Sequence, residues 1–139
     1  MLEYKDLKKI AYVRLREAKA LNKAGFYDGA VYLAGYVLEI ALKAVICKHL
    51  KVQDYPDKEN IFSTHNFDRL LLLSGLSEEI SAKNKRNKKL FFNWSIVTQW
   101  RPEGRYSPVG KYKEKDAKEF LKALDHRHDG VFTFIKRIW

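Results

Sequence analysis

Residues 29–50 read GAVYLAGYVLEIALKAVICKHL, and this stretch decides the fold class. A helix of this composition is apolar on nearly every face, so other elements have to surround it. Four charged or ionisable side chains interrupt the apolar run, and we therefore expect a core helix that is too polar to span a membrane. These side chains are Glu39, Lys43, Lys48 and His49.

A second helix is predicted on the N-terminal side of this stretch. Apolar residues recur at steps of three and four across residues 4–23, the spacing of an amphipathic helix. Gly25 is suited to end that helix and Asp28 to cap the next one. Such a short connection predicts that the two helices are antiparallel neighbours.

Three further helical segments are predicted on the C-terminal side. A short helix is expected through NFDRLLLLSGL (residues 66–76), capped by Ser63 or Thr64. The next covers residues 77–100, where a lysine cluster can interrupt it, and prolines and glycine then impose an irregular loop. The last covers residues 116–138, with Gly130 a weak point costing about 1 kcal/mol relative to alanine.

These patterns predict an all-α protein, an up-and-down bundle of four to five helices in a single domain over residues 1–139. The one cysteine, Cys47, excludes an intramolecular disulfide and fits a reducing compartment. The charged N-terminus reads as neither a signal peptide nor a membrane anchor, so we expect a cytoplasmic protein.

The charge balance permits binding to polyanions. Twenty-seven Lys and Arg against 17 Asp and Glu give a formal net charge of +10. Such a field attracts RNA or nucleotides, although lysine-rich surfaces also serve solubility alone. The densest basic tract lies in SAKNKRNKKL (residues 81–90), and its candidate nucleic-acid-binding residues are Lys83, Lys85, Arg86, Lys88 and Lys89.

Three segments carry a resemblance to a known family: AKALNKAGFYDGAVYLAGYVLEIALKAVICKHL (18–50), THNFDRLLLLSGL (64–76) and QWRPEGRYSP (99–108). In this order they resemble a prokaryotic HEPN domain. The resemblance implies a helical bundle that is usually a homodimer. It also implies either a partnership with a minimal nucleotidyltransferase or a role as a ribonuclease toxin in a toxin-antitoxin or defence pair.

The ribonuclease members of that family carry an Arg, four to six intervening residues and then a His. None of the four histidines here has an arginine at that spacing, so the catalytic pair cannot be transferred to this chain. Arg127 and His128 are the remaining candidates for a divergent, metal-independent ribonuclease. Both fall in the apolar stripe of the predicted terminal helix and are expected to face inward or toward a partner.

The loop WRPEGRYSP (residues 100–108) is the best candidate ligand site. Arg101 and Arg105 can converge on one phosphate, while Trp100 or Tyr106 covers a base. The alternative is a structural loop in which the aromatic side chains pack and Arg105 pairs with an acid.

Two further constellations have a structural and a functional interpretation. Glu39 and Lys43 share one helix face and can form either a structural ion pair or the polar wall of a ligand cleft. His65 can contact phosphate or bond to local backbone. No residue spacing indicates a metal site, and no cofactor motif is present.

The sequence therefore predicts a nucleotide- or RNA-binding module, with a ribonuclease and a purely structural dimerisation protein as alternatives. A two-fold dimer is expected because residues 29–50 and 116–138 carry more apolar surface than one small bundle readily covers.

Overall fold

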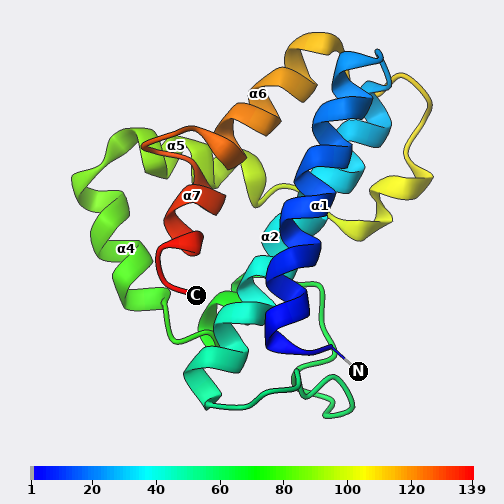
Figure 1. Ribbon diagram of the computed structural model, residues 1–139. Helices are drawn as coiled ribbons and strands as arrows, with labels where there is room; N and C mark the ends of the chain where they lie inside the picture. The colour runs from blue at the N-terminus through cyan, green and yellow to red at the C-terminus, as the bar shows by residue number, and fades with distance from the viewer. Residues whose placement is uncertain (1) are drawn as a thin grey trace.

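The computed structural model describes residues 2–139 and confirms the all-α fold class (Figure 1). Seven α-helices and one short 3₁₀ helix occupy the described residues, with no strand among them. They are α1 (Tyr4–Lys23), α2 (Tyr27–Leu50), α3 (Phe67–Leu73), α4 (Ser77–Arg86), α5 (Lys88–Val97), the 3₁₀ helix η1 (Pro102–Tyr106), α6 (Glu114–Asp125) and α7 (Val131–Lys136). The helices outnumber the five predicted segments because two of those segments are each divided.

Helix α2 is the centre of the bundle, with α1, α3, α6, α7 and η1 packed around it. By length and composition alone it could cross a membrane, since its most apolar window has a mean hydropathy of 1.8. The prediction that α2 is too polar to do so was therefore wrong on composition. Within the bundle 72% of that window is buried, as in the core helix of a globular fold.

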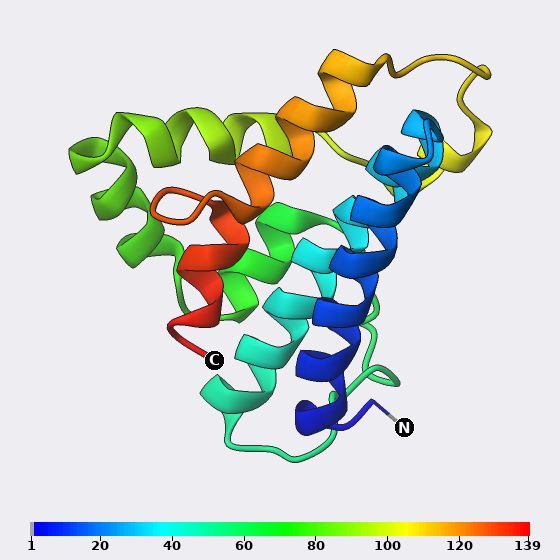
Figure 2. The same cartoon turned by 45° about the horizontal axis from the view of Figure 1, so that its top comes forward.

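The α1–α2 hairpin follows the sequence pattern closely. Leu7, Ala11 and Leu15 are buried at the predicted spacing, and the two helices run side by side over their length (Figure 2). Gly25 follows α1 with a φ of +88°, a conformation that glycine adopts without strain.

Asp28 does not cap α2, because the helix begins before it, at Tyr27. Its carboxylate instead accepts hydrogen bonds from the backbone N–H groups of Gly110 (2.6 Å) and Tyr112 (2.9 Å). These bonds, with that from Tyr112 the stronger influence, lower the pKa of Asp28 below its usual value. Asp28 thus ties the segment before α6 to the start of α2.

The predicted caps of α3 were also wrong. Asn66 is the N-cap, and its side-chain oxygen accepts from the N–H of Arg69 at 2.9 Å. Thr64 instead accepts a hydrogen bond from the N–H of Asn66 at 3.1 Å. Asparagine is a stronger N-cap than threonine, and here it lies directly before the helix.

The predicted helix over residues 77–100 is interrupted at Asn87, where the backbone is extended (φ −122°, ψ 96°). The Asn87 carboxamide oxygen caps α5 by accepting from the N–H of Leu90 at 3.0 Å. Its Nδ2 donates to the Asp129 carboxylate at 2.8 Å. The predicted interruption at the lysine cluster is therefore confirmed, and it arises from an asparagine cap held by a tertiary hydrogen bond.

The single terminal helix over residues 116–138 was wrong, because α6 ends at Asp125 and α7 begins at Val131 (Figure 2). The His126 ring fixes the turn between them, since its Nδ1 accepts from the N–H groups of His128 (3.3 Å) and Asp129 (3.0 Å). At Gly130 a β-carbon would lie 2.5 Å from the His126 backbone nitrogen, so only glycine fits.

Arg127 and His128 lie in this turn and are exposed, so the prediction that they face inward along a helix was wrong. The apolar faces of α2 and α7 are covered within one chain, where Leu38, Phe132 and Ile135 are fully buried. Little of the surplus apolar surface on which the dimer prediction rested is therefore left on these two helices, although Leu50 of α2 is 40% exposed.

Candidate functional site

Trp100 anchors the predicted ligand loop and cannot cover a ligand base. Only 4% of Trp100 is exposed, and its indole N–H donates to the Tyr32 carbonyl on α2 at 3.1 Å. The ring stacks on Phe67 at 5.6 Å and meets the edge of Tyr36 at 4.8 Å. Gly35 makes this approach possible, because a β-carbon there would lie 2.1 Å from the indole.

The two loop arginines do not converge. Arg101 donates to the carbonyl oxygens of Thr98 (2.7 Å) and Trp100 (2.8 Å), which completes the end of α5. The expected irregular loop is partly regular, because residues 102–106 form the 3₁₀ helix η1. Arg105 lies over the ring of Tyr106 at 4.8 Å and makes a long bond of 3.4 Å to the Pro102 carbonyl.

Arg105 lines a hollow of about 350 Å³ between the start of α2 and the segment that precedes α6; Arg101 does not. Tyr32, Trp100 and Tyr112 are aromatic residues that line this hollow, and Asp28 also lines it. Tyr106 is 78% exposed beside it and remains available to a ligand. Of the four predicted loop residues, Arg105 and Tyr106 keep a position suited to binding.

The Glu39–Lys43 pair on α2 is joined by His65 from the loop before α3. Glu39 is 3% exposed, and its Oε1 receives both Lys43 Nζ at 2.9 Å and His65 Nδ1 at 2.8 Å. The other oxygen, Oε2, is buried without a protein partner within residues 2–139. Burying a carboxylate is costly unless it is paired, so these contacts match the structural interpretation of the Glu39–Lys43 pair.

Tyr32 and Tyr36 lie on the part of α2 between Glu39 and the hollow beside Arg105. The Tyr32 and Tyr36 hydroxyls lie 3.3 Å apart. Burial, assisted by the contact with Tyr32, raises the pKa of Tyr36 to about 12, so the phenol stays protonated at neutral pH. Tyr32 and Tyr36 also contact Trp100, and they therefore lie between the Glu39 group and the loop.

The basic tract divides between two surfaces. Lys85 and Arg86 border a shallow depression on α4. Lys88 and Lys89, on α5, line a deeper cleft against α6. Lys83 is exposed on α4 and lines neither of them.

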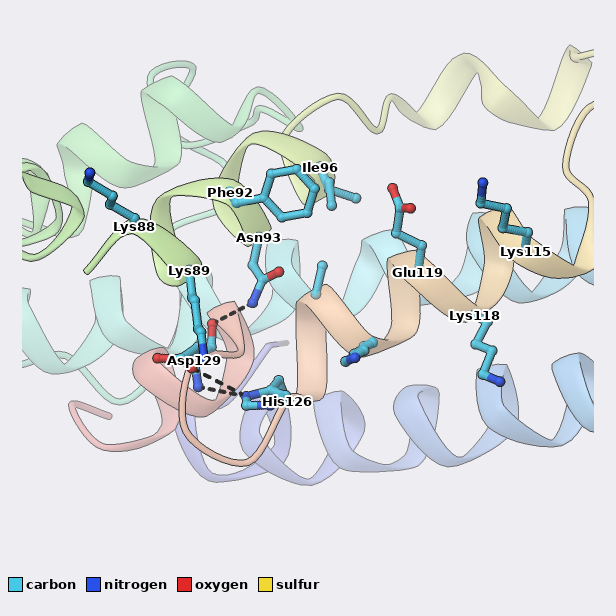
Figure 3. A pocket seen from close by; sticks show the side chains of 12 residues that line it. Lys88, Lys89, Phe92, Asn93, Ile96, Lys115, Lys118, Glu119, His126 and Asp129 are labelled. Carbon is cyan, nitrogen blue, oxygen red and sulfur yellow. Dashed lines mark hydrogen bonds and ion pairs between the residues drawn. The ribbon is translucent and has the colours of Figure 1, made fainter.

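The cleft between α5 and α6 has a volume of about 630 Å³, larger than the hollow beside Arg105 (Figure 3). Lys89, Asn93, His126 and Asp129 gather at one end, with Lys115 and Glu119 toward the other. The lining residues are Lys88, Lys89, Phe92, Asn93 and Ile96 of α5, Lys115, Lys118, Glu119, Lys122 and Ala123 of α6, and His126 and Asp129 of the following turn.

The cleft is strongly cationic. Five lysines line it, against the two carboxylates of Glu119 and Asp129. Within residues 2–139 no carboxylate lies within the 4.0 Å ion-pair distance of any of these lysines. The Asp129 carboxylate accepts from Asn87 at 2.8 Å and lies 3.7 Å from His126 Nδ1, and so its recorded polar contacts are not with the lysines.

His126 also lines the cleft. Its Nδ1 accepts two backbone N–H groups, so this nitrogen carries no hydrogen and the neutral ring is protonated at Nε2. Nε2 makes no other hydrogen bond within residues 2–139 and can donate to a ligand. Asn93 closes this end of the cleft by donating from Nδ2 to the Asp129 carbonyl at 2.9 Å.

Sequence reasoning missed the α6 half of the cleft, although a signal was present. Lys115, Lys118 and Lys122 recur at steps of three and four, which places them on one face of α6. That α5 lies opposite this face could not be predicted, because the turns at Asn87 and His126 set the geometry. Among the described residues, no group of three His, Cys, Asp or Glu side chains is placed to hold a metal ion.

Comparison with known proteins found a family but no individual relative. No curated protein matches the chain, and no solved structure does. The family model described as HEPN domain matches residues 4–126, nearly the whole sequence. The helical fold agrees with that match, and we conclude that the chain belongs to the HEPN domain family.

Proposed function

We propose that this HEPN protein binds the phosphate groups of RNA or of a nucleotide in the cleft between α5 and α6. HEPN domains are generally nucleotide- or RNA-related modules. The observation that carries the proposal is the set of five cleft lysines without an acid partner. Lysines that are not neutralised within the protein can replace the counterions of a phosphate backbone, and this exchange drives nucleic-acid binding.

The charge of the whole chain supports the same ligand class. A net charge of +10 attracts polyanions at long range, and a concave cationic surface concentrates that field. The cleft volume of about 630 Å³ falls within the roughly 300 to 1,000 Å³ of typical ligand sites. The cleft is therefore large enough for a nucleotide-sized group.

The hollow beside Arg105 is a second candidate position for a ligand phosphate, supported by the exposed Arg105 and Tyr106 next to it. If Arg105 binds phosphate, Arg105→Ala weakens nucleotide or RNA affinity by about 1 to 3 kcal/mol, the range for charge-assisted hydrogen bonds. Because the side chain is exposed, thermal stability then stays nearly unchanged. A loss of stability with unchanged affinity per folded molecule would assign Arg105 a structural role.

The wider setting is proposed from family membership. We propose that the protein is a homodimer that acts with a minimal nucleotidyltransferase or in a toxin-antitoxin or defence pair, and that it lacks the nuclease motif of the family. Two alternative functions can be tested on the purified protein. RNA cleavage by the purified protein, abolished by His128→Ala, would identify a divergent ribonuclease, and a stable dimer that binds no nucleic acid would identify a structural module.

The basic tract provides a matched experiment. Lys88→Ala/Lys89→Ala removes two cleft lysines, and Lys83→Ala/Lys85→Ala removes two lysines of the same tract outside the cleft. Affinity for a labelled RNA is measured by fluorescence anisotropy at several salt concentrations. The cleft variant should bind more weakly and lose about 0.7 from the logarithmic salt slope for each phosphate contact removed.

The control variant should keep most of the affinity and of the slope. Equal losses in both variants would show that RNA binds diffusely to the whole basic surface. Unchanged binding in the cleft variant would contradict the proposal. Thermal unfolding of each variant confirms that it is folded, as expected for exposed lysines.

A further inference from the structure

Phe92 is an exposed aromatic residue inside the cationic cleft. It lines the cleft from α5 and is 59% exposed, although burying such a ring would stabilise the fold. Ile96 and Ala123 continue an apolar floor beneath the lysines. A ligand made only of phosphate groups would leave this floor unused.

The neighbouring Phe91 is a contrasting case on the same helix. Its exposure, 56%, is nearly the same, but it does not line the cleft. Consecutive residues on a helix point about 100° apart, which separates the two rings. If a ligand binds in the cleft, replacing Phe92 should therefore weaken its binding more than replacing Phe91.

The end of the cleft at His126 offers both donor and acceptor groups. His126 has an Nε2–H without a partner within residues 2–139, and the Asp129 carboxylate, which accepts one bond from Asn87 and has further lone pairs, lies at the same end (Figure 3). Phosphate groups need donors only, whereas the edge of a nucleobase needs donors and acceptors together. This mixture favours a ligand that carries bases as well as phosphates.

The lysines of α6 follow the length of the cleft. Lys115 and Lys122 are seven residues apart, about 10 Å along a helix that rises about 1.5 Å per residue. Lys118 lies between them in the sequence and also lines the cleft, but its side chain points away from that of Lys115 (Figure 3). An extended strand can lay its phosphates along Lys115 and Lys122 while a base turns toward the floor.

We infer that the cleft binds single-stranded RNA in preference to duplex RNA, with one base stacked on Phe92. This inference rests on the proposed function and specifies its substrate class. In a duplex the faces of the bases are hidden in the stack, so a ring in a cleft cannot reach them. An acidic amphipathic helix is a poorer match, because the floor offers only three apolar side chains and ends in polar groups.

The test compares a short single-stranded RNA with its fully paired duplex at one ionic strength. The wild-type protein should bind the single strand at least about fivefold more tightly, because stacking one base is worth that much or more. Phe92→Ala should weaken single-strand binding roughly 5- to 150-fold, the effect of losing one base-stacking aromatic ring. Phe91→Ala should change it less than about twofold, and Phe92→Trp should restore binding.

The outcomes separate this inference from the proposed function. If single strand and duplex bind equally and Phe92→Ala binds as wild type, while Lys88→Ala/Lys89→Ala weakens both, the inference fails and the proposed function stands. If neither RNA binds, the inference fails, and if free nucleotides do not bind either, the proposed function fails with it. Tight binding of polyglutamate that does not depend on Phe92 would assign the cleft to an acidic protein segment and overturn the inference.

Discussion

At the scale of single residues, the absence of a side chain at Gly35 determines the position of η1. The indole of Trp100 occupies the space that a side chain would fill and bonds to the Tyr32 carbonyl on the same helix. This contact holds the start of η1 against the centre of the bundle, so that Arg105 reaches the hollow beside α2.

Gly35→Ala should therefore destabilise the protein. Overpacking a well-filled site typically costs about 1 to 3 kcal/mol, and in a domain of this size each kcal/mol lowers the melting temperature by about 4 °C. Gly29→Ala is the control on the same helix, because its β-carbon would meet only Leu21 at an ordinary 3.6 Å. We expect the control to be neutral or stabilising by up to about 1 kcal/mol. Equal melting temperatures for the two variants would contradict this account of the Trp100 contact.

Asp28 gives the fold a dependence on pH. The backbone bonds from Tyr112 and Gly110 favour its charged form and lower its pKa. The stability that they contribute is complete above the unfolded pKa of about 3.9 and is lost as pH falls through the lower folded value.

Asp28→Asn should accordingly melt below the wild type at neutral pH, and the difference should narrow below about pH 4. Thermal melts from neutral pH to about pH 2 measure this, with Asp57→Asn, an exposed loop aspartate, as the control. If the difference in melting temperature between Asp28→Asn and wild type stays constant over this pH range, the charge of the carboxylate does not stabilise the fold.

At the scale of helices, the side chains of Asn87 and His126 set the two breaks: the break at the lysine cluster was predicted, and the break after Asp125 was not. Asn87 both caps α5 and reaches Asp129, whereas Asn66 only caps α3. The two asparagines therefore allow the cap and the tertiary bond to be separated.

Asn87→Asp should keep the cap but place a carboxylate against Asp129, which loses a hydrogen bond and adds repulsion, at a cost of about 1 to 3 kcal/mol. Asn66→Asp should be neutral within about 0.5 kcal/mol, because aspartate caps as well as asparagine. Urea unfolding measures both variants. Similar losses would mean that the bond to Asp129 contributes little to fixing α5.

The local patterns in the sequence predicted the elements that local forces determine. The bounds of α1 agree to the residue, and the start of α2 differs by two residues. The breaks at Asn87 and at residues 126–130 depend on side chains bonding to distant or turn backbone, which periodicity does not encode. The candidate site shows the same limit of periodicity. The basic tract could be found in the sequence, but the division of its side chains between two surfaces follows from those breaks.

At the scale of the whole molecule, the core of one chain is complete without a partner. The homodimer stays a prediction from family membership, and the apolar side chains available to it lie elsewhere on the surface. The most exposed are Phe26, Ile61, Leu72, Phe91, Phe92, Tyr106 and Val109.

Light scattering at tens of micromolar should give twice the monomer mass, since this concentration exceeds a typical micromolar dissociation constant. The dimer mass should persist at high salt, because contacts among these apolar residues are not screened by ions. A monomer mass across that concentration range would contradict the prediction. The cleft lysines all lie within one chain, so a monomer would leave the phosphate-binding proposal intact.

The position of α7 has a consequence for synthesis of the protein. The α1–α2 hairpin can form once residues up to Leu50 have left the ribosome, since its contacts are local. The core that covers α2 also needs Phe132 and Ile135. At about 5 to 20 residues per second, the ribosome needs roughly 4 to 17 s to add that remaining stretch. During this interval the nascent hairpin presents apolar surface to the cell, which makes it a natural client for chaperones.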